Sequence, residues 1–350
     1  MSTVSTVSTV STVSTARDVY LSFFMFTVNL QPGNPAYAKV IAAHMRELRS
    51  LGYRGFDMPV YPNETLDHRA EVESYVDLKR ALDQAGLDDM GFTTNVAAMP
   101  MFNPAAEDPA VRANALDYLK SRVDITAALG GSIMAGPMVF PYNVFPQTAA
   151  GEPIWSDALQ DWLQAGYRHA QPILDQAGEY AAGKGVKLAI EPVDHWETPA
   201  PNMLGDVLRF LEGVPSRAVG SVCDIAHVVL GSSGPEAFRD EVCRLAGADR
   251  LSYVQVSAPD RGAVRDSWIP WGVLLPTVLP RYRGPLLIEI FNAIPAFLTP
   301  LHLTRRKFWI PGEDEPVAGA PDAYTVAGEA IEELEKQLSA YAEHHPEGGR

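Results

Sequence analysis

Short runs of apolar and β-branched residues alternate along this chain with longer segments whose apolar residues recur at helical spacing. The short runs predict eight strands, at residues 19–28, 52–60, 89–97, 132–140, 187–193, 219–228, 251–259 and 284–293. The clearest helical segments between them cover residues 35–52, 110–130 and 155–185.

A strand followed each time by a helix-sized segment is the pattern of a parallel sheet. The count of eight such units favours an α/β protein with a closed (β/α)8 barrel, the TIM barrel. A doubly wound open sheet is the alternative. It is disfavoured because no glycine-rich phosphate loop follows any of the early strands.

The chain is expected to form one folded domain over residues 17–350, preceded by a tail. Residues 1–16 repeat Ser-Thr-Val, with neither the basic start nor the apolar block of a secretory signal. We expect this tail to be disordered. Two connections are longer than barrel loops usually are: residues 141–155, and the extension 294–321 between strand eight and the last helix.

Composition limits the partners. The 350 residues are 47% hydrophobic and carry a net charge of −15, which disfavours nucleic acid and anionic membrane surfaces. No apolar run reaches the ~18 residues that a membrane span needs. The two cysteines, Cys223 and Cys243, form no disulfide framework and have no metal-ligand spacing. A reducing cytoplasm is the expected location.

Polar residues stand where the predicted strands end, and in such barrels the carboxyl ends of the strands form the active site. Strands five, six and eight bring Glu191, Asp224 and Glu289 there, and strand seven brings Gln255. Three carboxylates in apolar strands need a counter-charge, which a divalent cation supplies. Oxygen-only ligation favours Mn²⁺ or Mg²⁺ over Zn²⁺. Taken singly, each residue could instead cap a helix, form an ion pair or hydrogen-bond inside the barrel.

The stretch KLAIEPVDHWET adds further candidates after strand five. Side chains alternate along a strand, so Glu191, His195 and Glu197 share a face if the strand stays extended. We then expect all three to point into the barrel mouth. His227 differs in parity from Asp224, so it joins them only if the chain turns. Either histidine could instead be a structural residue.

The order Glu, Asp, strand-seven ligand, Glu resembles that of the xylose-isomerase-like barrels, the sugar phosphate isomerase/epimerase superfamily. Within it, the ketose 3-epimerases are similar in detail. The resemblance implies that Glu191, Asp224 and Glu289 hold the metal. It also implies sugar contacts from a Glu six after the first Glu, a His three after the Asp and an Arg six after the strand-seven ligand, here Glu197, His227 and Arg261. Those epimerases carry His where Gln255 stands, whereas some lyases and dehydratases of the superfamily carry Gln.

A second resemblance covers nearly the whole folded chain. The segments LKSRVDITAALGG, AIEPVDHWETP, YVQVSAPDRG and EIFNAIPAF…LTRRKFWIP resemble the α subunit of the bacterial C-deglycosylation enzymes. This resemblance implies a small β subunit as partner, hence a hetero-oligomer. It also implies a 3-oxo C-glycoside of an aromatic aglycone as substrate. Mn²⁺ is the expected ion, with Mg²⁺ or Co²⁺ as alternatives.

The chemistry implied is a carbon–carbon lyase reaction. A ketone at C3 makes the C2 proton acidic, a base removes that proton, and elimination breaks the C1–aryl bond as the aglycone carbon gains a proton. We expect His195 to be the base, because a nearby cation would keep it neutral near pH 7. Glu197, His227 and Arg261 would orient the sugar. Four aromatic residues of the long connection could form an aglycone wall or merely pack the loop: Phe140, Tyr142, Phe145 and Trp155.

Several alternatives stay open. A metal-dependent keto-sugar 3-epimerase or isomerase would use the same site, with Glu191 and Glu289 as paired acid–base groups. A scaffold subunit that only binds sugar is the non-catalytic hypothesis. An endonuclease with the same fold is disfavoured by the net charge. The segment with Arg305, Arg306, Phe308 and Trp309 could be a protein interface or a lid over the barrel.

Overall fold

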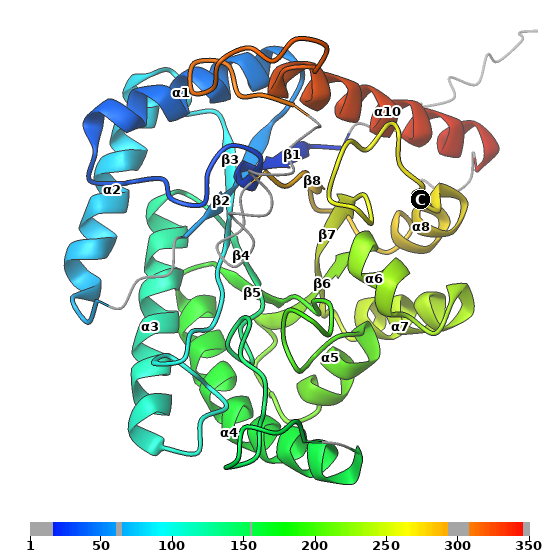
Figure 1. The fold of residues 1–350 in the computed structure, drawn as a ribbon. Helices are drawn as coiled ribbons and strands as arrows, with labels where there is room; N and C mark the ends of the chain where they lie inside the picture. The colour runs from blue at the N-terminus through cyan, green and yellow to red at the C-terminus, as the bar shows by residue number, and fades with distance from the viewer. Residues whose placement is uncertain (1–16, 61–64, 155, 293–307, 346–350) are drawn as a thin grey trace, which may run out of the picture.

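The computed structural model describes residues 17–60, 65–154, 156–292 and 308–345. Eight parallel strands close into a barrel in sequence order, which confirms the predicted (β/α)8 fold (Figure 1). The strands are β1 Val19–Ser22, β2 Gly55–Pro59, β3 Gly91–Asn95, β4 Ile133–Gly136, β5 Lys187–Ile190, β6 Val219–Asp224, β7 Leu251–Ser257 and β8 Leu286–Glu289.

Helices surround the barrel and cover the outward faces of the strands (Figure 1). They are α1 Pro35–Ser50, α2 His68–Gln84, α3 Pro109–Ala128, α4 Ser156–Gly183, α5 Leu204–Leu211, α6 Ile225–Gly231, α7 Pro235–Gly247, α8 Trp271–Val278 and α10 Ala323–His344, with a 3₁₀ turn, η1, at Phe23–Met25. No helix in the described part of the chain is long and apolar enough to cross a membrane.

Side-chain caps fix where several helices begin. The Asn34 side chain accepts hydrogen bonds from the backbone N–H groups of Ala36 and Tyr37 just before Pro35, and Asp108 plays the same part before Pro109. An N-cap acceptor followed by proline suits a first turn, whose N–H groups have no helical partner.

Most strands end earlier than the apolar runs that predicted them. The run 219–228 is a strand only as far as Asp224, whose carboxylate accepts a hydrogen bond of 2.9 Å from the backbone N–H of Ala226. This cap starts α6 and turns His227 toward the barrel axis. The run 187–193 likewise stops being a strand at Ile190. The polar residues beyond these two strand ends, His227 and Glu197 among them, therefore lie on turns at the mouth rather than on extended strands.

The barrel interior carries a polar layer below the mouth. The Thr93 hydroxyl donates a hydrogen bond of 2.5 Å to Asp57 Oδ1 and lies 2.9 Å from the Tyr253 hydroxyl, across the barrel on β7. Ser22 pairs with Asp57 in the β1–β2 register and so faces the same way. Burial, reinforced by the charge of Glu191, raises the pKa of Asp57 to about 7 against the lowering effect of the Thr93 hydrogen bond.

Part of the predicted extension returns along the outside of the barrel. Phe308 and Ile310 are buried, and Trp309 forms a bridge with Asp322 just before α10. His44 of α1 holds this segment, with Nε2 2.9 Å from Glu313 Oε1 and Nδ1 2.8 Å from the Tyr324 hydroxyl. Residues 294–307, including Arg305 and Arg306, lie outside the described residues, as does the predicted tail 1–16.

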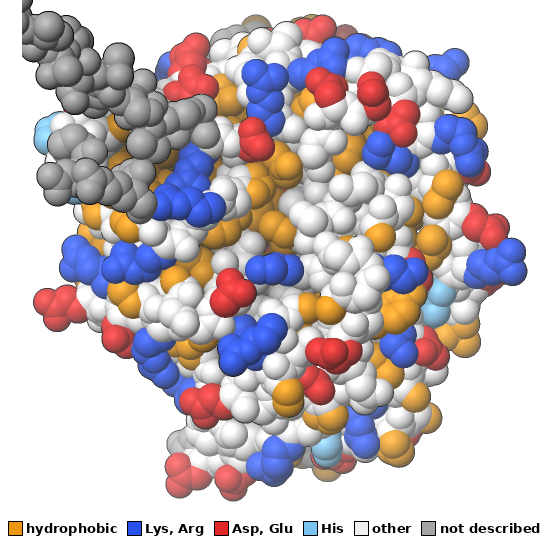
Figure 2. Space-filling model, turned by 180° about the vertical axis from the view of Figure 1, so that it is seen from behind, with side chains coloured by type: hydrophobic (Ala, Val, Ile, Leu, Met, Phe, Trp, Pro, Cys, Tyr) orange, Lys and Arg blue, Asp and Glu red, His pale blue; other side chains and the backbone are white. Residues whose placement is uncertain are grey.

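The surface seen from behind carries both signs of charge. In Figure 2, Lys and Arg side chains are interspersed with Asp and Glu over this face. A nucleic-acid-binding face gathers its basic side chains into a patch or stripe. The face shown there has no such gathering.

Candidate active site

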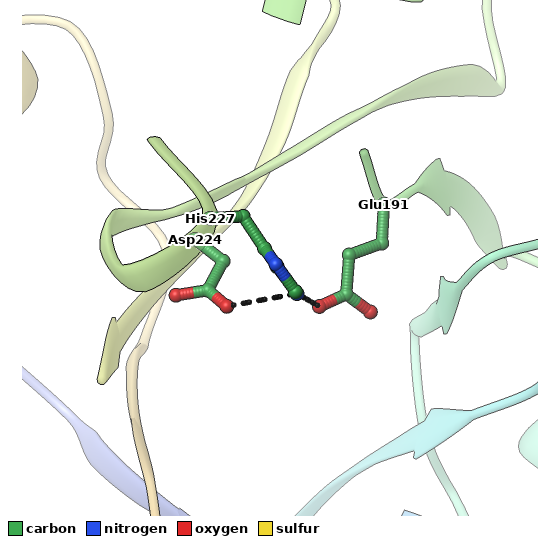
Figure 3. Close-up of side chains that lie close together, drawn as sticks. All are labelled: Glu191, Asp224 and His227. Carbon is green, nitrogen blue, oxygen red and sulfur yellow. Dashed lines mark ion pairs between the residues drawn. The ribbon is translucent and has the colours of Figure 1, made fainter. Parts of the chain in front are cut away.

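Three carboxylates meet at the carboxyl end of the barrel, as the sequence predicts. Glu191 directly follows β5, Asp224 ends β6 and Glu289 ends β8. All three side chains are buried. Figure 3 shows Glu191 and Asp224 on either side of the His227 ring.

His227 lies at the centre of the acidic cluster, and each of its nitrogens faces carboxylates. Nε2 is 3.4 Å from Glu191 Oε1 and 3.4 Å from Asp224 Oδ2. Nδ1 is 3.3 Å from Asp194 Oδ2 and 3.7 Å from Glu197 Oε2. The structure thus brings His227 into the site by the turn that its position required.

Opposing influences act on the pKa of His227. Burial and the Arg261 guanidinium lower it, but Asp224, Asp194 and Glu191 raise it more strongly, so that it reaches about 10.

The sequence analysis did not place Asp194 in the site. The cluster of acids in PVDHWE was the available signal, but its parity placed Asp194 away from the barrel mouth.

Arg261 reaches into the cluster from the loop after β7. Its Nη1 donates to Asp224 Oδ2 at 2.5 Å, to Glu289 Oε2 at 3.0 Å and to Ser257 Oγ at 3.1 Å. Its guanidinium carbon lies 5.0 Å from the centre of the Phe291 ring. Burial lowers the pKa of Arg261, but the two carboxylates raise it more strongly, so the guanidinium is charged.

The pKa values of the two carboxylates paired with Arg261 change in opposite directions. Burial raises the pKa of Asp224, but Arg261, His227 and the Ser257 hydroxyl lower it further, to below its usual range. Burial raises the pKa of Glu289 well above its usual range, because Glu191 and Asp224 add to the effect of burial while Arg261 opposes it.

Gln255 and Glu289 hold polar atoms without partners. Gln255 pairs with Asp224 in the β6–β7 register and is fully buried. Its side-chain nitrogen and oxygen have no hydrogen-bond partner among the described residues. The same is true of Glu289 Oε1. Buried polar atoms normally have partners. These orphaned oxygens beside Glu191 and Asp224 therefore fit an oxygen-bound divalent cation.

Within the part of the chain that the structure describes, the His, Asp and Glu side chains grouped closely enough to hold a cation form two sets that share His227. One comprises Glu191, Asp224 and His227, and the other Asp194, Glu197 and His227; within each set, one ligand atom from every residue lies within 4.8 Å of the others. Glu191 and Asp224 of the first set belong to the predicted metal site, whereas His227 is expected to contact sugar.

Glu197 joins two loops at the mouth. Its Oε1 accepts a hydrogen bond of 2.8 Å from the Tyr142 hydroxyl, and its Oε2 accepts one of 3.1 Å from the backbone N–H of Asp194. The backbone N–H of Asn143 donates to the Glu197 carbonyl at 2.6 Å. Burial raises the pKa of Glu197, against lowering by His227 and Arg261.

The expected position of His195 is wrong. After Ile190 the chain leaves the extended conformation, and the carbonyl of Asp194 accepts from the backbone N–H of Glu197 at 2.7 Å. This turn directs Glu197 inward and leaves His195 exposed, its ring centre 4.8 Å from that of Trp196. The alternation of side chains holds only while a strand stays extended.

A cavity of about 380 Å³ opens beside the cluster. Its polar end is formed by Glu191, Glu197, His227 and Glu289. Its wall is mainly apolar, with Phe24, Val28, Pro59, Val60, Ala97, Ala98, Met99, Pro100, Pro137, Val193 and Phe291, together with Asn95, Tyr142 and Asn143. The volume suits a small-molecule ligand.

The four aromatic residues predicted for an aglycone wall lie in different environments. Tyr142 lines the cavity. Phe140 is buried in the core against Trp162, with ring centres 5.1 Å apart, and Phe145 is exposed. Trp155 lies outside the described residues. No sequence signal marked Phe24, in the η1 turn after β1, or Met99, after β3, as residues of the cavity wall.

Comparison with known proteins agrees with the barrel fold described above. The family described as xylose isomerase-like TIM barrel matches residues 45–314. A solved structure from Anabaena variabilis, described as a candidate sugar phosphate isomerase/epimerase, is 53% identical, covers 93% of this chain and 99% of its own, and has a TM-score of 0.90.

Two curated relatives are more distant. The L-ribulose 3-epimerase of Methylomonas sp. strain DH-1 is 25% identical over 53% of this chain and 59% of its own. The ketose 3-epimerase of Arthrobacter globiformis is 23% identical over 54% and 60%. The chain thus matches less than two thirds of the length of either. With the family match over most of its length, the chain belongs to the xylose isomerase-like TIM barrel family.

Proposed function

We propose that this chain is a divalent-metal-dependent keto-sugar epimerase, which removes a proton next to a carbonyl group and returns one to the opposite face. One observation carries the proposal: Glu191 and Glu289, three strands apart around the barrel, both line the polar end of the cavity. The matches to an L-ribulose 3-epimerase and a ketose 3-epimerase support it.

The two glutamates supply both halves of the proton exchange. One carboxylate accepts the proton from the carbon next to the carbonyl, which leaves an enolate. The second glutamate, in its protonated form, donates a proton to the other face of that carbon. The configuration at this carbon inverts, and the enzyme has exchanged one proton for another. Glu197 and His227, which also line the cavity, would bind sugar hydroxyl groups.

Glu191, Asp224, Gln255 and Glu289 would hold the metal. A bound divalent ion supplies a Lewis acid that stabilises negative charge on the substrate oxygens. Carboxylate and amide oxygens favour Mn²⁺ or Mg²⁺, and we expect Mn²⁺, with Co²⁺ as an alternative. Gln255 is neutral and brings no ring nitrogen, which keeps the donor set one of oxygens.

A second candidate function is the carbon–carbon lyase, and the apolar wall of the cavity favours it. Phe24, Met99 and Phe291 face the same space as the polar end, which suits a sugar joined to an aromatic group. One of the two cavity glutamates would then remove the C2 proton of the 3-oxo sugar in place of His195. A C1–C2 double bond would form as the C1–aryl bond breaks, and the aglycone carbon would gain a proton. A small β subunit remains a proposed partner of this activity.

Isotope exchange and product analysis separate the two candidates. The Mn²⁺-loaded chain is incubated in D₂O with ketoses such as L-ribulose and D-allulose, and with a 3-oxo C-glucoside, the latter with and without a co-expressed small partner. NMR reports deuterium next to the carbonyl, an epimeric ketose, or a released aromatic compound. Glu191→Gln, Glu289→Gln and chelator should each abolish exchange, while His195→Ala should retain it.

The epimerase proposal requires an epimeric ketose with solvent deuterium at the inverted carbon. Release of the aromatic compound without epimerised ketose would replace it with the lyase. If neither ketoses nor the 3-oxo glucoside exchange deuterium with the loaded wild-type chain, both candidates are wrong.

A further inference from the structure

Arg261 bridges two of the carboxylates that are proposed to hold the metal. A single nitrogen, Nη1, donates both to Asp224 Oδ2 at 2.5 Å and to Glu289 Oε2 at 3.0 Å. Asp224 Oδ1 already accepts from the Ala226 N–H at 2.9 Å and from the Ser257 hydroxyl. An ion that binds Asp224 needs the Oδ2 that Arg261 holds, whereas Glu289 still offers Oε1. Arg261 and a divalent cation therefore compete for Asp224 Oδ2.

The backbone of Arg261 is held from both sides, whereas its side chain has somewhere to go. The Arg261 N–H donates to the Ala258 carbonyl at 2.8 Å, and its own carbonyl accepts from the Phe291 N–H at 2.9 Å. Its φ of 57° is left-handed, an uncommon conformation for a non-glycine residue. Its guanidinium stacks on Phe291, whose side chain lines the cavity. Movement across that ring would carry the guanidinium toward the substrate.

The charges explain why a cation is needed in either state. Glu191, Asp224 and Glu289 are all buried within the barrel mouth. Unpaired buried carboxylates are costly, so the metal-free barrel requires internal counter-charges, and Arg261 supplies one at Asp224 and Glu289 beside the neighbouring His227. A guanidinium brings one positive charge and a divalent cation two, so the cation wins the shared oxygens when it is present.

We propose that Arg261 is the resident counter-ion of the metal-free site and that a divalent cation must displace it to bind. This inference rests on the proposed function, because it concerns the metal centre of the same site. It also accounts for the position of Arg261, which is expected to contact sugar but is not among the described residues that line the cavity. The contact with sugar becomes available only after displacement.

The test measures Mn²⁺ affinity by isothermal titration calorimetry in the full chain after chelation and dialysis. Arg261→Met removes the competing charge and should bind Mn²⁺ about 10- to 100-fold more tightly than wild type, the range expected when a competing interaction of this kind is removed. Arg261→Lys keeps the charge without the planar fork and should fall between the two. Arg265→Met is the matched control, because Arg265 lies in the same loop and pairs with Glu329 of α10. Its affinity should stay within about twofold of wild type.

Thermal unfolding gives a second readout that needs no substrate. With chelator, Arg261→Met should melt below wild type, because its carboxylates lose their counter-charge. With saturating Mn²⁺, the two should melt at similar temperatures. If Arg261→Met does not fold without metal, the tighter binding of Arg261→Lys still carries the test.

Two outcomes overturn different claims. If Mn²⁺ binds the Arg261 variants as weakly as wild type, or more weakly, the displacement inference is wrong while the metal centre stands. If neither wild type nor the variants bind Mn²⁺, Mg²⁺ or Co²⁺, the metal centre itself is wrong, and the proposed function fails with it.

Discussion

Replacing Asp57 with Asn is expected to remove a pH dependence from the stability of this chain. Asp57 is fully buried in β2, and within the described part of the chain its Oδ2 has no hydrogen-bond partner. Burial, with a contribution from Glu191, raises its pKa from 3.8 to about 7, although the hydrogen bond from Thr93 opposes this. The carboxyl group thus holds its proton more tightly in the folded chain than in the unfolded chain.

The sign and size of the effect follow from that difference in proton affinity. A group with a raised pKa in the folded state favours folding fully at a pH below its unfolded value of 3.8, and the advantage is lost as the pH rises toward 7. The difference between 3.8 and about 7 corresponds to about 4 kcal/mol. For a chain of 350 residues, this is about 6 °C in Tm. Asn cannot ionise, although its buried NH₂ group costs about 1–3 kcal/mol at every pH if it finds no partner.

The assay follows thermal unfolding by circular dichroism between about pH 4.5 and 8.5, in chelator, for wild type, Asp57→Asn and the exposed control Asp88→Asn. The Tm of Asp57→Asn minus that of wild type should rise by about 4–5 °C across this range, since part of the effect lies below pH 4.5. The control difference should stay flat. A constant difference for Asp57→Asn would refute the reasoning, because it would mean that folding does not change the proton affinity of this carboxyl group.

Three further substitutions test other parts of the structure. Tyr142→Phe removes the hydrogen bond to Glu197 Oε1 and should lower kcat/KM by about tenfold; an unchanged value in steady-state assays would show that this bond does not matter for substrate binding. His195→Ala should leave kcat within about twofold of wild type, since this residue is exposed, and a large loss would restore it as the base. Gly91→Ala would place a Cβ against the Tyr20 ring inside the barrel and should lower the stability measured by urea denaturation by about 1–3 kcal/mol. Wild-type stability in that variant would contradict the packing described.

The barrel was predictable from the sequence because the short apolar runs of the strands and the helical spacing of apolar residues rarely overlap along the chain. Runs such as 187–193 and 284–293 are too short and too apolar to be surface helices, and each is separated from the next by a helix-sized segment. Strand ends were harder to predict, because polar contacts decide them. The cap that Asp224 makes to Ala226 ends β6 inside an apolar run that by itself reads as continuous strand.

The candidate site was predictable where a residue stands directly at a strand end and not beyond. Glu191, Asp224 and Glu289 converge because the strands themselves carry them. His195 failed because a turn intervenes, and a turn reverses the parity rule without leaving a signal in apolar spacing. Asp57 was missed although it is an acid in the apolar run 52–60, a combination that signals a polar barrel interior.

The tie between Glu197 and the Tyr142–Asn143 segment has a consequence for protein engineering. This tie joins the loop that contributes to the cavity wall to a carboxylate at the polar end. Selectivity and turnover are therefore mechanically linked. Libraries that randomise the wall for new substrates should vary both loops jointly, because single-loop variants would trade preference against speed.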